Sequence, residues 1–131
     1  MTSAELKYLT AIKSLCTGSE GISLTDISVK VGVSKVSVYR AVEHLEKGGY
    51  VERDEKNKVV ITPYGIGCLE EYTTIVMWLG EHFEKHCNVS KCVAYEDAVG
   101  AVCAISDQCR RGIFEHMNKA MAQSHDDKGE T

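Results

Sequence analysis

The chain of 131 residues is 44% hydrophobic and 26% charged, and its formal net charge is −4. This composition is sufficient for a packed core without disulfides or a structural metal, and no apolar run reaches the ~18 residues that a membrane span needs. The first residues have neither the basic cluster nor the continuous apolar segment of a secretory signal, so we expect a cytoplasmic protein with no membrane partner.

Three helices are predicted in the first third of the chain. Residues 3–17 place apolar side chains three or four positions apart, and a shorter helix spans about residues 24–30. Gly32 allows a sharp turn, and Ser34 is well placed to cap a third helix over about residues 35–47. The apolar side of this third helix consists of Val38, Ala41, Val42 and Leu45.

Two short β segments follow, at residues 50–53 and 58–61, and a polar turn of residues 54–57 joins them. This pattern predicts a β-hairpin. Three helices followed by a hairpin is the element order of a winged helix-turn-helix domain, and no other common small fold matches it as well.

The second half of the chain is predicted to be helical. Thr62 and Pro63 provide an N-cap and a first-turn proline for a long helix over residues 64–87. Two more helices are expected at about residues 92–104 and 107–121. Because the long helix is apolar on more than one side, it is expected to be buried on more than one side. A second copy of the chain supplies the second surface most simply.

The expected fold class is mainly α with a small β-hairpin. It combines a winged helix-turn-helix with an all-helical dimerisation domain. The expected divisions are a DNA-binding domain at 1–63, a helical dimerisation domain at 64–123 and a flexible tail at 124–131.

The exposed side of the third helix carries the candidate DNA-binding residues. A helix fits the major groove of B-DNA, and side chains on its first two turns reach base edges. Arg40 suits a bidentate contact with guanine. The full set, with two wing lysines near the DNA backbone or minor groove, is Ser34, Lys35, Ser37, Tyr39, Arg40, Lys56 and Lys58. The alternative is an ordinary solvated helix face.

The distribution of charge is compatible with a nucleic-acid partner. Residues 1–64 carry nine Lys/Arg and eight Asp/Glu, a net charge of +1, whereas residues 65–131 carry six and eleven, a net charge of −5. The acidic surplus therefore belongs to the second half, and the first half can present a basic face.

Over about residues 4–118 the sequence resembles the diphtheria toxin repressor and manganese transport regulator family of iron- and manganese-dependent repressors. The resemblance rests on Tyr8 to Ile12, Ile27 to Ser34, Ser37, Val38, Arg40, Leu45, Gly49, Val51, Ile61, Thr62, Gly65, Tyr95 to Ala98, Ile105 and Ser106. It implies a homodimer of winged helices that binds a palindromic operator when a divalent metal joins its two regions.

The ligands of that family's metal site are not kept in this chain. Position by position, they fall on Lys7, Thr10, Met77, Glu81, Val99, Val102 and Cys103. A lysine replaces an anion, and the two valines offer no donor atom. Because Mn²⁺ and Fe²⁺ need oxygen and imidazole ligands, we expect no manganese sensing at this site.

Three interpretations of the replaced site stay open. The residues could fill the vacated space as apolar core. Alternatively, Met77 and Cys103 could form a soft-ligand site that suits Cu(I) or haem better than Mn²⁺. Finally, a transition metal could bind a neighbouring group that matches no established zinc spacing. That group is Glu81, His82, His86, Cys87 and Cys92.

The six cysteines include no Cys-x-x-Cys pair, which excludes a zinc ribbon or a thioredoxin-type site. We expect them to be reduced and mostly buried as small apolar groups. Cys87 and Cys92 lie near a predicted loop and are the candidates for a response to oxidation.

The sequence therefore favours a homodimeric transcriptional repressor that binds palindromic double-stranded DNA and has no assured cofactor. One alternative is a metal-independent winged-helix regulator that responds to a small molecule or to thiol oxidation. Another is a protein-interaction module, which the net charge of −4 favours. An enzyme is not expected, because no Ser-His-Asp arrangement, phosphate-binding glycine loop or convergent carboxylate pair is present.

Overall fold

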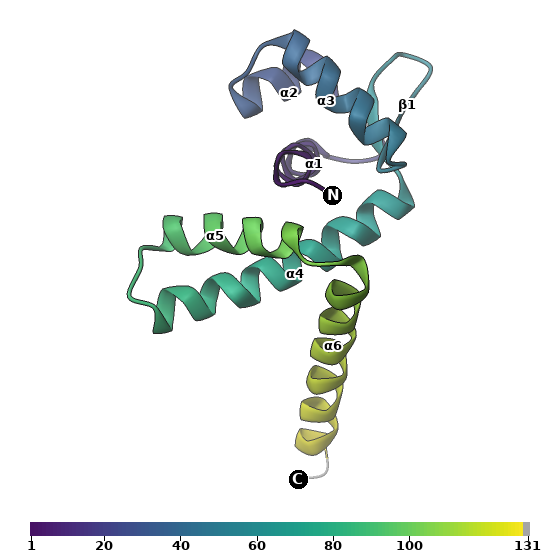
Figure 1. Cartoon of the computed structure of the whole chain (residues 1–131). Coiled ribbons are helices and arrows are strands. Elements are labelled where there is room, and N and C mark those ends of the chain that lie inside the picture. The colour runs from purple at the N-terminus through teal and green to yellow at the C-terminus, as the bar shows by residue number, and fades with distance from the viewer. Residues whose placement is uncertain (130–131) are drawn as a thin grey trace. The chain divides into compact units, whose positions relative to one another are not determined.

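A computed structural model describes residues 1–129, with residues 123–129 described as backbone only (Figure 1). Within these residues the expected fold class is confirmed: helices and one two-stranded antiparallel hairpin. The elements are α1 (Ser3–Leu15), α2 (Leu24–Val31), α3 (Lys35–Lys47), β1 (Val51–Arg53), β2 (Val59–Ile61), α4 (Pro63–His86), α5 (Lys91–Ala104) and α6 (Asp107–Gly129). None of the described helices is long and apolar enough to span a membrane.

The chain forms two compact units, Met1–Glu70 and Glu71–Thr131. In the first unit α1, α2 and α3 bury the apolar stripes that their sequence spacing predicts. The fully buried side chains contributed by these helices are Leu9, Ile12, Ile27, Val38, Val42 and Leu45. A buried set at intervals of three or four residues places each helix with one side against the others.

The hairpin closes this core on one side. Val51 pairs with Ile61 and Arg53 with Val59 in the antiparallel register. Ile22, in the segment between α1 and α2, adds an isolated bridge, because its N–H and carbonyl both bond Val59 at 2.8 Å. The wing is therefore attached to the helical core through backbone hydrogen bonds as well as through side chains.

Thr62 joins the hairpin to α4. Its hydroxyl oxygen accepts from the N–H of Gly65 at 3.0 Å and so caps the helix. The same hydroxyl lies 2.6 Å from the carbonyl oxygen of Gly49, to which it donates. The first turn of α4 then passes directly over Tyr50, since a Cβ at position 65 would lie 2.1 Å from the Tyr50 carbonyl oxygen. Only glycine fits at position 65.

In the second unit, α5 packs beside the later part of α4 (Figure 1). The ring of Tyr95 rests on the backbone of Gly80, where a Cβ would come within 2.8 Å of it. Small side chains on α5 permit this close approach, and Ala94 and Ala98 are both fully buried. Ile75 of α4 is 2% exposed and contributes the largest aliphatic group of this core.

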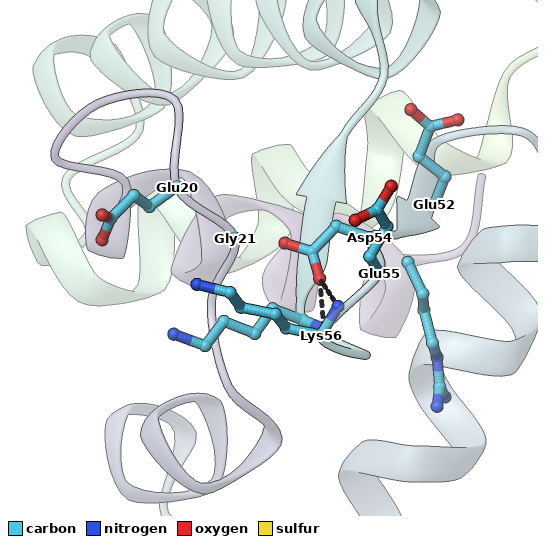
Figure 2. A pocket seen from close by; sticks show the side chains of 8 residues that line it. Glu20, Gly21, Glu52, Asp54, Glu55 and Lys56 are labelled. Atoms are coloured by element: carbon cyan, nitrogen blue, oxygen red, sulfur yellow. Dashed lines mark hydrogen bonds between the residues drawn. The ribbon is translucent and has the colours of Figure 1, made fainter.

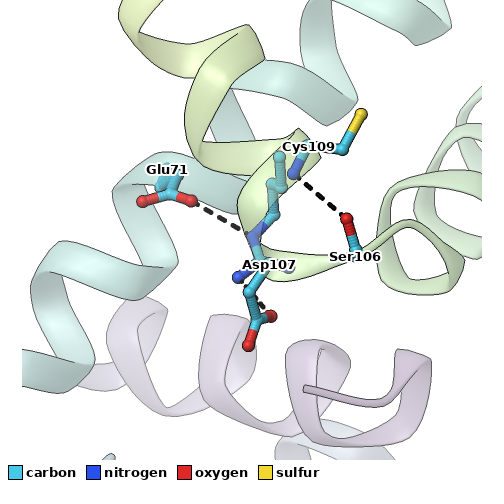
Figure 3. Close-up of polar contacts among 5 residues, drawn as sticks. Glu71, Ser106, Asp107 and Cys109 are labelled. Carbon is cyan, nitrogen blue, oxygen red and sulfur yellow. Dashed lines mark hydrogen bonds and ion pairs between the residues drawn. The ribbon is translucent and has the colours of Figure 1, made fainter.

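Arg110 fixes the start of α6 to α4 by binding Glu71 and Asp107, the two carboxylates labelled in Figure 3. Its Nε donates to the carboxylate of Glu71 at 3.1 Å, and a terminal nitrogen donates to Asp107 at 2.8 Å. The guanidinium also lies 4.1 Å from the ring centroid of Tyr72. With two carboxylates and an aromatic face as partners, this nearly buried cation is compensated on several sides. The hydrogen bond from Arg110 and its positive charge lower the pKa of Asp107.

Two expectations need correction. The last helix does not end near residue 121 but continues to Gly129, because the intervening residues include no proline or glycine that would stop it. The expected tail 124–131 thus overlaps this helix, and residues 130–131 lie outside the described part. The cysteines are not mostly buried either: three are half-buried, and Cys87, Cys92 and Cys109 are exposed near helix ends. Aliphatic and aromatic side chains fill the cores instead.

The contact at Gly65 predicts a destabilising substitution. Gly65→Ala forces the α4 backbone away from Tyr50, at a cost of about 1–3 kcal/mol in the free energy of unfolding. Gly67→Ala is the matched control in the same helix, because nothing lies within 4 Å of a Cβ there. The free energy of unfolding of the control should rise by about 0.5–1 kcal/mol, because alanine has a higher helix propensity than glycine. Urea denaturation of the three proteins measures both values, and equal stability of the two variants would contradict the packing at Gly65.

The Arg110 cluster predicts a dependence of stability on pH. The folded pKa of Asp107 is lowered from its ordinary value of 3.8, so its contribution is present above that value and is lost as the pH falls below it. In Asp107→Asn, which cannot titrate, thermal melts between pH 5 and about pH 2 should show a shallower loss of stability than in the wild type. The same slope in both proteins would mean that Asp107 does not contribute.

Candidate nucleic-acid interface

The turn between α2 and α3 sets the direction of the exposed helix. Gly32 ends α2 in the left-handed region at φ 79°, which glycine adopts without steric cost. The carbonyl of Ser28 accepts from the N–H groups of Gly32 and Val33, at 2.9 and 3.2 Å. The Ser28 hydroxyl donates to the Val33 carbonyl at 2.7 Å. The turn is therefore held by three hydrogen bonds centred on one serine.

Ser34 caps α3 as the sequence predicts. Its hydroxyl oxygen accepts from the N–H of Ser37 at 3.2 Å, and the two hydroxyls lie 3.1 Å apart. The cap satisfies one of the free N–H groups at the helix start and leaves the positive end of the helix dipole at the surface. A positive helix end that faces solvent is suited to a phosphate group.

The first two turns of α3 present all the predicted residues of this helix to solvent. Ser34, Lys35, Ser37, Tyr39 and Arg40 are exposed. Within the part of the chain that the structure describes, neither Lys35 nor Arg40 forms an ion pair, so both charges are available to a ligand.

Val36 lies among these residues and is 63% exposed, a feature that the sequence analysis did not single out. An exposed aliphatic group on a reading helix can contact the methyl group of thymine. The sequence could have indicated this exposure, because Val36 lies between Lys35 and Ser37 and outside the apolar period of α3.

Arg53 of the wing is a second residue that the sequence analysis missed. Its Nε donates to the carboxylate of Glu46 at 2.9 Å, and a terminal nitrogen donates to the side-chain oxygen of Asn57 at 3.1 Å. Its guanidinium lies 4.9 Å from the ring centroid of Tyr39. Arg53 therefore joins the wing to α3 and covers part of Tyr39. Strand alternation, which places residue 53 on the same face as the buried Val51, could have indicated this role.

The tip of the wing is organised by Asp54 (Figure 2). One carboxylate oxygen of Asp54 accepts from the N–H groups of Lys56 and Lys58, both at 2.9 Å. Asn57 completes the turn in the left-handed region at φ 61°. Of the two predicted wing lysines, Lys56 is exposed and Lys58 is half-buried.

A groove of about 640 Å³ runs along the wing beside the segment that precedes α2. Its lining is Glu20, Gly21, Glu52, Arg53, Asp54, Glu55, Lys56 and Lys58 (Figure 2). Four carboxylates and three cations alternate there, so the wing is mixed in charge and less suited to phosphate than the start of α3.

The predicted metal-binding residues do not assemble into a site of three or more ligands. Among the described residues no group of that size exists from His, Cys, Asp and Glu. Glu81 instead pairs with Lys85 at 2.6 Å, and the hydrogen bond and charge of Lys85 lower the pKa of Glu81. Met77 is 62% exposed, whereas Cys103 is half-buried.

The remaining candidates lie near the loop between α4 and α5. Cys87 and Cys92 are exposed on either side of it. His82 and His86 are one helical turn apart, with ring centroids separated by 5.7 Å. The structure thus offers no set of oxygen and imidazole ligands for Mn²⁺ or Fe²⁺ in these residues.

One family model matches part of the first unit. Residues 7–55 match the IclR helix-turn-helix domain. This match covers α1 from Lys7 onward, α2, α3 and β1. No curated protein matches this sequence.

Solved structures share the fold over most of the chain. The hypothetical protein SSo2273 from Sulfolobus solfataricus superposes with a TM-score of 0.70 at 21% identity, over 91% of each chain. The manganese regulator SloR gives 0.68 at 23% identity, and T. acidophilum IdeR gives 0.56 at 19%. Each of these two matches covers 90% of this chain and 55% of the other protein. The chain therefore has the winged helix-turn-helix fold found in transcription regulators, and it spans about half the length of these two.

Proposed function

We propose that this protein is a homodimeric transcriptional repressor that binds a palindromic DNA operator through α3. The observation that carries the proposal is the exposed face at the start of α3, held by the Gly32 turn and the Ser34 cap and carrying two unpaired cations. A helix presented in this way fits the major groove. The match of residues 7–55 to a helix-turn-helix domain supports the same function.

The roles of individual residues follow from their positions. Arg40 lies on the second turn of α3 and would contact guanine, while Lys35 at the first turn would contact phosphate. Val36 would contact a thymine methyl. The acidic residues Glu43 and Glu46 occupy the last turns of α3. Their negative charges would repel the phosphates of DNA, so the helix would enter the groove with its N-terminal half.

A dimer is supported by the second unit, and its two-fold symmetry would match that of a palindromic site. The outer side of α5 exposes small and apolar groups beside the acidic Glu96 and Asp97. Val93 is 47% exposed, and Gly100 has nothing within 4 Å of a Cβ position. Ala101 and Ala104 are exposed on the same helix. A helix face of small residues permits the close approach of a second helix.

The family's manganese site does not contribute to this function. Its ligand positions include Lys7, Val99 and Val102, and the described residues form no other cluster of three or more ligands. These replacements favour a metal-independent regulator over one that responds to a metal.

Arg40→Ala should weaken binding to the operator by about 1–3 kcal/mol, the range for one bidentate base contact. The matched control is Lys13→Ala, which removes an equal charge from the exposed side of α1. Fluorescence anisotropy with an operator fragment, selected from random duplexes by the wild type, measures both affinities. The titrations are run with EDTA and with Mn²⁺, and we expect the same affinity in the two buffers.

Equal affinities of the Arg40 and Lys13 variants would contradict the position of α3 in the groove. A titration over salt concentration separates DNA binding from a protein-interaction function. Phosphate contacts give an affinity that falls steeply with salt, whereas a protein-interaction module would select no operator.

Val93→Glu should shift the protein from dimer to monomer, because it places a charge in an apolar helix contact. Val29→Glu is the matched control, since Val29 is 77% exposed on α2 in the first unit. Light scattering coupled to size-exclusion chromatography gives the mass of each. A monomeric wild type would contradict the dimer, and a dimeric Val93 variant would contradict its interface on α5.

A further inference from the structure

Three aromatic rings form a column along the exposed side of α4. Trp78, His82 and His86 are spaced four residues apart, so they lie one above another on the helix. The ring centroids of Trp78 and His82 are 4.6 Å apart, and those of His82 and His86 are 5.7 Å apart. Both histidines are exposed, and Trp78 is 44% exposed. The winged-helix function described above does not use this column.

A hydrogen bond fixes which nitrogen of His82 is available. Its Nδ1 lies 3.0 Å from the carbonyl oxygen of Trp78. Because a carbonyl oxygen can only accept, Nδ1 carries the proton in this contact, and Nε2 of the neutral ring keeps its lone pair. Metal-binding histidines commonly donate their second ring nitrogen to a backbone carbonyl in this way, which orients the ring and increases its basicity.

His86 supplies a second imidazole one turn further along. A zinc–nitrogen bond is about 2.0–2.1 Å long, so one ion can bridge two rings at this separation with small side-chain rotations. Glu81 lies on an adjoining part of the helix, but its carboxylate is held by Lys85 at 2.6 Å. Within the described residues no third His, Cys, Asp or Glu completes the group. The chelate therefore has two imidazoles, and solvent fills the other positions.

This donor set selects the type of metal. Imidazole suits Zn²⁺, Ni²⁺ and Cu²⁺, whereas Mn²⁺ prefers oxygen ligands and is the weakest binder in the divalent series. We propose that His82 and His86 form a two-histidine chelate on the exposed side of α4 that binds one Ni²⁺, Cu²⁺ or Zn²⁺ ion and excludes Mn²⁺. The site does not depend on DNA binding or on the positions of the family's metal ligands.

The column contains its own reporter, because Trp78 is the only tryptophan in the chain. Calorimetric titration of the full-length, untagged and reduced protein with Ni²⁺ should give one ion per chain. The fluorescence of Trp78, measured in parallel, should change with the same midpoint, since the ion binds to the His82 ring, whose centroid lies 4.6 Å from that of Trp78. Zn²⁺ should compete for the site, and a tenfold excess of Mn²⁺ should not.

Variants identify the ligands. His82→Gln and His86→Gln should each weaken Ni²⁺ binding at least about tenfold, since losing even an outer partner of a ligand costs 10–100-fold. His116→Gln removes a single exposed histidine of α6 and should leave the affinity unchanged. Circular dichroism verifies that the helices of each variant are retained, as expected for exposed positions.

Three results would overturn the proposal. The first is the absence of stoichiometric Ni²⁺ binding to the wild type. The second is wild-type affinity in both His82→Gln and His86→Gln. The third is loss of binding in Cys87→Ser without an effect of the two histidine substitutions, which would assign the ion to the exposed thiol that follows His86.

Discussion

The candidate interface depends on the conformation of three residues between α2 and α3. Gly32 has a left-handed backbone conformation, and the carbonyl and hydroxyl of Ser28 form hydrogen bonds within the turn. These contacts fix the direction in which α3 leaves the turn. Ser34 then caps the helix and fixes where its first exposed side chain stands. Because Val38 and Val42 on the opposite side are fully buried, α3 cannot rotate without exposing core. The position of this candidate surface is thus determined by the buried side of α3 as much as by its exposed side.

Arg53 links this surface to the wing. It contacts Glu46 and Tyr39 on α3 and Asn57 in the wing turn, so it compensates an acidic residue of the helix within the unit. The distribution of charge along the chain explains how a protein with a net charge of −4 can present a basic helix start. The carboxylates collect in the last turns of α3, on the wing and in the second unit, whereas Lys35 and Arg40 form no ion pair with any residue that the structure describes.

In the second unit, different residues set the packing of the helices and the supply of potential metal ligands. Its helices are held by close packing of Tyr95 on Gly80 and by Arg110 between Glu71, Asp107 and Tyr72. The solved structures that share the fold include proteins described as manganese and metal-dependent regulators. At the positions that the resemblance gives for metal ligands, this chain has Lys7, Val99 and Val102, while an imidazole pair stands on another face of α4. Fold and metal preference are therefore separate properties, since packing fixes the fold and a few donor atoms fix the metal.

The sequence by itself determined the elements and the exposed side of α3, because periodicity, caps and turn residues act over a few neighbouring positions. Periodicity and caps were enough to identify three exposed residues as DNA-binding candidates, namely Lys35, Ser37 and Arg40. The tertiary structure alone decided that Arg53 covers Tyr39, that Gly65 must lie against Tyr50, and that Arg110 binds Glu71, which is 39 residues away. It also showed that the cysteines are not mostly buried. These features depend on which residues meet after folding, and such contacts between distant positions leave no periodic pattern in the chain.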